Sequence, residues 1–138
     1  LTPRFVSEKN SLHIAKRSPM FKFYNRHPGH RKLPDCVCRA ISLALRMPYY
    51  EVMDMLIDNG VCYDCDELTV KCYSKLLNEL GYIATKVENK TVQELAKENS
   101  DDILLVRIEG HLTCCINGEC YDIWDCSERN VDMYWVIR

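Results

Sequence analysis

The pattern of hydrophobic and polar residues divides the chain into a helical first half and a stranded second half. Residues 20–25 predict a short strand, and residues 26–34 form a basic, turn-rich loop. From residue 36 onwards, apolar residues recur every three or four positions, the spacing of a buried helical face. This spacing predicts three helices: one over residues 36–46, one from Pro48 to a stop at Gly60, and one with the inner face Tyr73, Leu76, Leu77 and Leu80.

The second half follows the two-residue period of β-strands. The pattern predicts strands over residues 82–87, 103–108, 111–116, 119–124 and 131–137, and one short helix over residues 92–98. Thr91 and Glu94 have the spacing of a capping box, and Asn117-Gly118 is a strong two-residue hairpin signal. Helices followed by strands predict an α+β domain whose C-terminal sheet is antiparallel.

The two-residue turn also predicts which side chains of the hairpin are neighbours. If Ile116 pairs with Glu119, then His111 pairs with Trp124 on the same face, and Asp122 lies diagonally across from the histidine. Asp125 follows just after the strand. Either carboxylate can reach His111, so the spacing leaves both open.

Size and charge narrow the possible functions. A chain of 138 residues suits one domain, which we assign to residues 20–138. The net charge of -2 provides no field that favours nucleic acid or an anionic membrane, and no apolar run approaches the ~20 residues of a membrane span. Residues 1–19 lack the apolar core of a secretion signal. We interpret them as a flexible arm, a cloning remnant or a misassigned upstream start.

The chain has nine cysteines, an odd number that cannot all pair internally. With no secretion signal, we expect reduced thiols in a cytoplasm, most of them small buried hydrophobes. The alternative is structural zinc, because Cys62-x-x-Cys65 with Cys72 suits half of a tetrahedral site. No second Cys-x-x-Cys completes that site, and we therefore predict no metal.

A cysteine, a histidine and an acid follow one another along the chain in an order typical of thiol-based catalysis. Cys36 begins the first predicted helix after Asp35, which is placed to cap it, and His111 opens a late strand with an acid one strand later. A helix N-terminus and a nearby imidazolium both favour the thiolate, and an acid can hold the imidazole in the useful tautomer. The backbone N–H of Cys36, in the first helical turn, is free to bind an oxyanion. The order predicts the nucleophile, base and orienter of a thiol hydrolase.

Three motifs carry a family resemblance: Asp-Cys-Val-Cys-Arg-Ala-Ile at residues 35–41, Gly-His-Leu-Thr at 110–113 and Tyr-Asp-Ile-Trp-Asp-Cys at 121–126. They resemble the papain-like cysteine peptidase superfamily, in particular small phage and gut-bacterial domains related to the bacteriocin leader peptidases. The resemblance runs from about residue 20 to the end. It implies a papain-like fold in which N-terminal helices carry the nucleophile and pack on the sheet.

The same resemblance implies roles for residues. Cys36 would be the nucleophile, His111 the base and Asp125 the orienter, because the orienter in such folds usually ends the strand after the histidine strand; Asp122 is the alternative. The chain departs from the family at the oxyanion hole. Where relatives have an upstream Gln, this chain has His30, Arg31 and Lys32, and Asn25 is the nearest amide.

The sequence therefore predicts a cytoplasmic cysteine hydrolase that cleaves a peptide, isopeptide or related amide bond through an acyl-enzyme. Its partner would be a protein or peptide substrate, and it needs no cofactor. The basic loop at residues 26–32 is either a solvated loop or a selector of acidic substrates. The main alternative is a catalytically weak or inactive papain-like scaffold that acts as a protein-binding or inhibitory module. A small zinc-stabilised structural protein is the third hypothesis.

Overall fold

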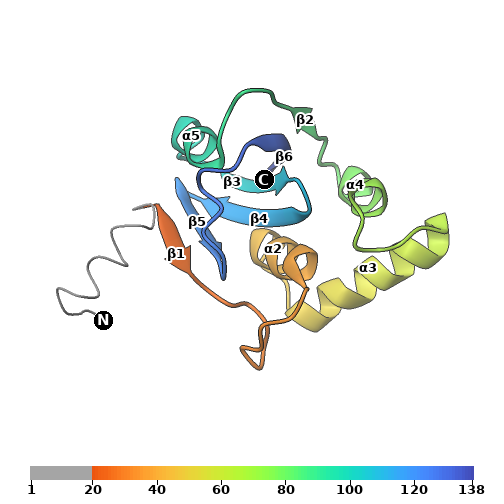
Figure 1. Cartoon of the computed structure of the whole chain (residues 1–138). Coiled ribbons are helices and arrows are strands. Elements are labelled where there is room, and N and C mark those ends of the chain that lie inside the picture. The colour runs from red at the N-terminus through yellow and green to blue at the C-terminus, as the bar shows by residue number, and fades with distance from the viewer. Residues whose placement is uncertain (1–19) are drawn as a thin grey trace.

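A computed structural model of the chain describes residues 20–138, so the interpretation of residues 1–19 lies outside the described part. Helices and strands alternate in an α+β arrangement, which confirms the predicted fold class (Figure 1). In chain order the elements are β1 (Phe21–Phe23), α2 (Cys36–Leu45), α3 (Tyr49–Tyr63), α4 (Val70–Glu79), β2 (Thr85–Lys86), α5 (Val92–Glu98), β3 (Ile103–Ile108), β4 (His111–Ile116), β5 (Glu119–Asp122) and β6 (Val131–Ile137).

The strands form one sheet in the order β1-β5-β4-β3-β6-β2. All neighbouring strands are antiparallel except β1, which runs parallel to β5 with Phe21 opposite Cys120. The expectation of an antiparallel sheet was therefore wrong at this edge. Strand β1 precedes the helices in the chain and pairs with β5, the second strand of the hairpin. A hydrophobic pattern carries no information on strand direction, so the sequence did not specify this pairing.

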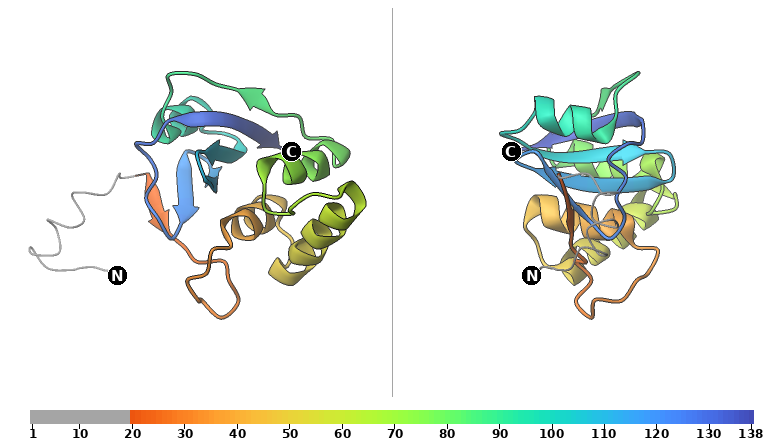
Figure 2. Two further views of the ribbon diagram at one scale, coloured as in Figure 1. Left: turned by 45° about the vertical axis from the view of Figure 1, so that its right-hand side comes forward. Right: turned by 60° about the vertical axis from the view of Figure 1, so that its left-hand side comes forward.

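Helices cover both faces of the sheet. Helices α2, α3 and α4 lie on one side and α5 on the other (Figure 2). Along β3, Leu105 packs with the α2 side, whereas Leu104 and Val106 pack with α5. A strand buried on both faces typically has a continuous apolar sequence, as residues 103–106 do before Arg107. No helix within residues 20–138 has the length and apolar character needed to cross a bilayer.

The helices agree with the sequence except at the ends of α3 and α4. Helix α4 ends at Glu79, so Leu80, which was predicted on its inner face, is the C-cap and is exposed. Helix α5 has the predicted bounds, and Thr91 and Glu94 form the reciprocal capping box. Helix α3 does not stop at Gly60 but continues to Tyr63 and ends at Asp64, which adopts a left-handed conformation with φ 53°. A Cβ on Gly60 would lie 2.9 Å from the carbonyl oxygen of Cys65. This glycine therefore allows the following loop to pack closely against the helix.

Three predicted strands are shorter than the pattern suggested. The strand expected over residues 20–25 covers only Phe21–Phe23. The strand expected over residues 82–87 keeps only Thr85 and Lys86, which pair with β6. Strand β5 ends at Asp122 instead of Trp124, because the N–H of Ile123 donates to the Asp122 carboxylate at 2.7 Å. This side-chain contact replaces a ladder hydrogen bond and turns the chain away from the sheet.

Disulfides join Cys65 to Cys72 and Cys115 to Cys120. The expectation that all cysteines are reduced was therefore wrong for four of them, and the zinc hypothesis fails because two of its three ligands are bonded to each other. The hairpin register explains the second pair, since Cys115 lies directly opposite Cys120. The remaining cysteines are free, and three of those five are buried as expected: Cys38, Cys114 and Cys126.

The capping box should make a measurable contribution to the free energy of unfolding. Replacing Thr91 with Ala removes the acceptor for the Glu94 N–H and should lower the free energy of unfolding by about 1 kcal/mol in urea titration. Glu94→Ala removes the reciprocal bond to the Thr91 N–H and should have a similar effect. The double variant should lose less than the sum of the two, and strict additivity would contradict a reciprocal unit.

Candidate active site

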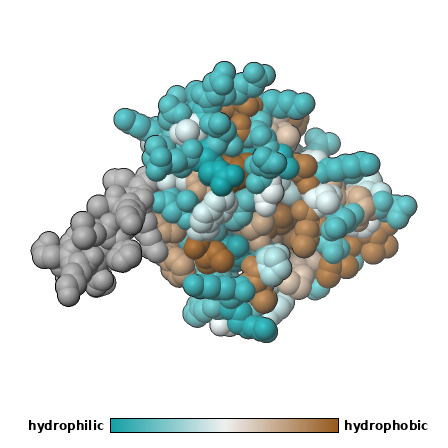
Figure 3. Space-filling model, viewed as in Figure 1, coloured by the Kyte–Doolittle hydropathy of each residue, from teal (hydrophilic) through white to brown (hydrophobic). Residues whose placement is uncertain are grey.

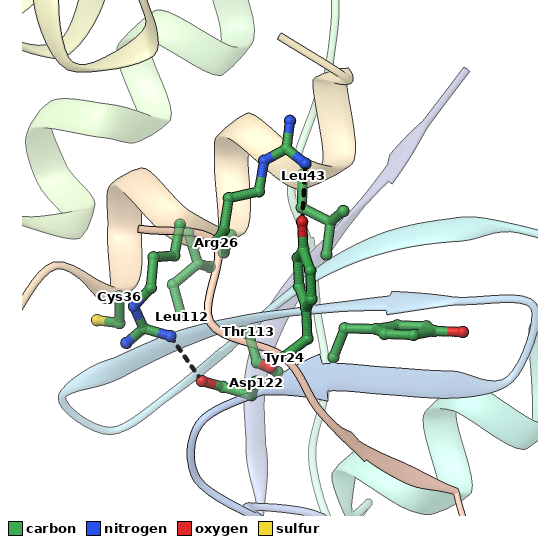
Figure 4. Close-up of a pocket in the computed structure, with 10 residues that line it drawn as sticks. Tyr24, Arg26, Cys36, Leu43, Leu112, Thr113 and Asp122 are labelled. Carbon is green, nitrogen blue, oxygen red and sulfur yellow. Dashed lines mark hydrogen bonds and ion pairs between the residues drawn. The ribbon is translucent and has the colours of Figure 1, made fainter. Parts of the chain in front are cut away.

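Two of the predicted site residues, Cys36 and His111, lie together with the alternative acid, Asp122, where the hairpin opens. Cys36 is the first residue of α2, His111 the first of β4 and Asp122 the last of β5. In an antiparallel pair, the start of one strand and the end of the next lie at the same end, and the N-terminus of α2 points at this end (Figure 4). Residues far apart in the chain thus share one small volume.

His111 is held by Asp122. Its Nε2 lies 2.6 Å from the Asp122 Oδ2, which leaves Nδ1 as the ring nitrogen for the Cys36 thiol. The edge of the imidazole also contacts the ring of Trp124, with 4.9 Å between the ring centroids. The predicted neighbours of His111, Trp124 beside it and Asp122 diagonally across, are confirmed.

Asp125, the preferred orienter, lies beyond β5 and hydrogen-bonds to Ser127. Its Oδ1 accepts hydrogen bonds from the backbone N–H of Ser127, at 3.1 Å, and from the Ser127 hydroxyl. Because β5 ends early at Asp122, Asp125 falls in the loop beyond the strand and stabilises the turn there. The position beside the His111 Nε2 that we expected Asp125 to take is occupied by the alternative, Asp122.

Asn25, offered as an oxyanion donor, is bound within its own loop. Its Nδ2 donates to the carbonyl of Arg31 at 2.9 Å, and its Oδ1 accepts from the N–H of His27 at 3.0 Å. These bonds close the loop at residues 25–31, so Asn25 has a structural role there. The backbone N–H of Cys36, by contrast, has no acceptor among residues 20–138, as expected for the first turn of a helix.

The electrostatics favour an ion pair between the thiol and the imidazole. Burial opposes ionisation of Cys36, but hydrogen bonds to His111 and to the backbone of Leu112 outweigh it and lower the pKa of the thiol. Burial likewise opposes protonation of His111, but its hydrogen bonds to Asp122 and Cys36 raise the imidazole pKa to about 9. Both shifts favour the pair of thiolate and imidazolium.

A buried ion-pair network supports the orienting acid. The Arg39 Nη1 donates to the Asp122 Oδ1 at 2.9 Å, and the Arg39 Nε donates to the Asp35 Oδ1 at 2.7 Å. The Tyr49 hydroxyl donates to the other oxygen of Asp35 at 2.7 Å. Burial opposes ionisation of Asp122, yet hydrogen bonds from His111 and Arg39 among others lower its pKa. Asp122 therefore stays ionised beside the imidazole.

Sequence reasoning did not assign a role to Arg39 or Tyr49. The signal for Arg39 was available, because it lies four residues after Asp35 on the face of a helix that is otherwise apolar. Asp35 was expected to cap that helix, but its side chain makes no capping hydrogen bond and binds Arg39 and Tyr49 instead. Nothing in the sequence pointed to Tyr49.

A cleft of about 270 Å³ opens beside the thiol. Cys36, Gly110 and His111 form one part of its lining, and Arg107 lies on the same side. The rest of its wall is mostly apolar and comes from α2, α4, the loop before α4 and strand β4: Val37, Leu68, Thr69, Val70, Tyr73 and Leu112. A side chain or a short stretch of polypeptide fits a cavity of this size next to the Cys36 thiol.

Cys126 completes a group of metal-type donors with His111 and Asp122, whose ligand atoms lie within 4.8 Å of one another. The group suits a cation poorly. Both Asp122 oxygens already accept hydrogen bonds, one from the Arg39 guanidinium, which would repel a metal ion. Burial raises the pKa of Cys126 to about 12, so its thiol stays protonated at neutral pH.

Comparisons with protein-family models, with curated proteins and with solved structures found no match to this chain. The interpretation of the site therefore depends on its geometry.

The identity of the orienting acid can be tested by titration. Asp122→Asn removes the carboxylate beside His111, so the imidazole pKa should fall from about 9 towards the ordinary value of 6.5. Asp125→Asn removes a carboxylate that contacts Ser127 and should leave the titration unchanged. NMR titration of the histidine ring in both variants checks this, and a shift in the Asp125 variant alone would restore Asp125 as orienter.

Loss of Arg39 should destabilise the fold in a pH-dependent way. Arg39→Met leaves Asp35 and Asp122 buried without their cation, at a cost of about 3–5 kcal/mol in the free energy of unfolding near neutral pH. Because the folded Asp122 has a lowered pKa, this cost is fully present above the ordinary value of 3.8 and shrinks as pH falls below it.

Arg26→Met is the matched control for that variant. Arg26 also stabilises α2, by hydrogen bonds to the Ser42 hydroxyl and the carbonyl of Met47, but within residues 20–138 it forms no ion pair with a carboxylate. Its loss should cost less and should show no corresponding change at acid pH. Equal, pH-independent losses in urea unfolding of the two variants would contradict the ion-pair account.

Proposed function

We propose that this chain is a papain-like cysteine hydrolase that cleaves a peptide, isopeptide or related amide bond through an acyl-enzyme. The observation that carries the proposal is the relay from thiol to imidazole to buried carboxylate, with the thiol on a helix N-terminus. A purely structural cysteine would gain nothing from a neighbouring group that lowers its pKa. Perturbed groups lining a cleft are typical of catalytic sites.

In the proposed acylation step, the Cys36 thiolate attacks the carbonyl carbon of the substrate. The carbonyl π-electrons move to oxygen, and the resulting oxyanion accepts a hydrogen bond from the free N–H of Cys36. The imidazolium of His111 then donates its proton to the amine nitrogen as the carbon–nitrogen bond breaks. The amine leaves and a thioester to Cys36 remains.

Deacylation reverses the role of the histidine. Neutral His111 takes a proton from a water molecule that attacks the thioester, and the thiolate leaves as the acid product forms. Asp122 stays ionised throughout and holds the imidazole by its Nε2, so that Nδ1 faces the sulfur. The cycle needs no cofactor. Trp124, whose ring contacts His111, covers one side of this pair.

A second candidate is the binding or inhibitory module on the same scaffold. The observation in its favour is the oxyanion hole: the Asn25 amide is bound to Arg31, which leaves the Cys36 N–H as the one donor we assign there. Loss of one such donor typically costs about 10²–10³ in rate. Such a module would use the same cleft to hold a protein segment without cleaving it.

The cytoplasmic location belongs to this proposal as well. A nucleophilic thiol must be reduced, which agrees with a cytoplasm, whereas two disulfides are more typical of oxidising compartments. Mass mapping of the protein isolated from its native source, after immediate alkylation, would show which pairing exists there.

Alkylation of individual cysteines tests the ion pair directly. In wild type, the rate of Cys36 with iodoacetamide should reach half its plateau well below pH ~8.5, the pKa of a free thiol. His111→Ala should move that midpoint upward. Cys62, the free exposed thiol, is an internal control whose profile should be the same in both proteins.

Turnover provides the second part of the test. Cys36→Ala should abolish release of product from an amide or peptide substrate identified by screening, with an unchanged unfolding transition. The hydrolase proposal fails if the alkylation rate of Cys36 in wild type has the same pH dependence as that of Cys62 and does not change in His111→Ala.

A further inference from the structure

Helix α3 presents an apolar stripe to solvent. Tyr50, Ile57 and Val61 lie seven and four residues apart, on one side of the helix, and are 58%, 44% and 80% exposed. Leu68, in the loop after α3, is 46% exposed. In Figure 3, brown apolar atoms gather among hydrophilic ones over the part of the surface where α3 lies. Apolar groups gathered in this way on a surface typically mark an interaction site.

An apolar groove runs alongside this stripe. It encloses about 270 Å³ between α3, the start of α2 and the loop that contains Leu68. Its wall is mainly hydrophobic, with Leu33, Pro34, Met53, Leu56, Ile57 and Leu68 among the lining residues. A groove of this volume accommodates one or two aliphatic side chains. We call the stripe and the groove together the α3 surface.

The α3 surface is acidic. Residues 47–70 carry six acids and no Lys or Arg: Glu51, Asp54, Asp58, Asp64, Asp66 and Glu67. This segment thus has a charge of -6, while the chain as a whole has -2, so the remainder carries -2 - (-6) = +4. None of the six forms an ion pair within residues 20–138. Glu67 is part of the groove lining, so at least one of these acids lies at the edge of the groove.

The α3 surface is continuous with the candidate active site. Leu68 lines both the groove and the cleft beside Cys36 and His111. On the other side, Pro34 and Asp35 line the groove directly before Cys36 in the chain. The groove and the cleft thus share Leu68 as a common wall, and the groove lies next to the start of the helix that carries Cys36.

We propose that the α3 surface is a docking site for a polypeptide segment that combines aliphatic side chains with flanking Lys or Arg residues, and that the substrate carries this segment. The second clause rests on the proposed hydrolase function; the first does not. The aliphatic side chains fill the groove, and the basic ones face the acids of α3 and its loop. Tyr50, at one end of the stripe, offers an aromatic face to a cation.

The charge also decides against other occupants. A second copy docking through the same surface in a two-fold arrangement would bring -6 against -6. An anionic membrane would be repelled in the same way. A basic segment is the partner whose charge complements the rim while its apolar residues satisfy the groove.

A pair of designed peptides tests the proposal with the full chain. The probe is a fluorescent 14-residue amphipathic peptide with Leu at one helical face and Lys elsewhere, and its partner has Glu in place of every Lys. Fluorescence anisotropy should show binding of the Lys peptide, weakening as salt rises, and no binding of the Glu peptide.

Matched charge reversals separate the α3 surface from general attraction. Asp54→Lys with Asp58→Lys should weaken binding of the Lys peptide by about tenfold or more. Glu88→Lys with Asp101→Lys makes the same change in net charge at exposed acids outside the surface, and should have little effect. Ile57→Ser with Val61→Ser should weaken binding at constant charge.

Equal weakening by the two charge reversals, or no effect of the serine pair, would overturn the proposal. So would self-association of the full chain through this surface in place of peptide binding. The peptide-binding result does not depend on the reactivity of Cys36. Binding without a reactive thiol would contradict the hydrolase function alone. A reactive thiol without binding would contradict the docking proposal alone.

Discussion

The buried contact between Arg39 and Asp122 is the interaction on which the site depends. It joins the helix that carries the thiol to the strand that carries the orienting acid, across 83 residues of chain. A buried ion pair is stabilising only when its remaining hydrogen-bonding positions are filled. Here Asp35 accepts a hydrogen bond from the Arg39 Nε. The Asp122 carboxylate is also hydrogen-bonded to His111 and to the N–H of Ile123.

The same contact sets the electrostatics of the thiol. An ionised Asp122 keeps a proton on His111, and the imidazolium in turn favours the Cys36 thiolate. Each charge is therefore compensated by the next, from a helix N-terminus to a buried guanidinium. The half-buried thiol keeps a lowered pKa because these favourable contacts exceed the cost of removing it from water.

The molecule is asymmetric about this site. On one side lies the hairpin, whose strands are joined by the Cys115–Cys120 disulfide. On the other lies the acidic α3 surface, and the loop after α3 is tied to α4 by the Cys65–Cys72 disulfide. Leu68 and Thr69, inside that closed loop, line the cleft beside Cys36. The Cys65–Cys72 disulfide thus holds in place the loop that forms one wall of the cleft.

The sequence by itself determined the α+β class, most elements, the capping box and the nearness of His111 to Trp124 and Asp122, because these follow from local periodicity and turn chemistry. The direction of β1, the end of β5, the cysteine pairing and the choice of Asp122 over Asp125 needed the tertiary structure. Each depends on contacts between distant segments: β1 against β5, Cys65 against Cys72, Arg39 against Asp122. Spacing along a chain does not specify which of two carboxylates lies nearest to a cation brought by another element.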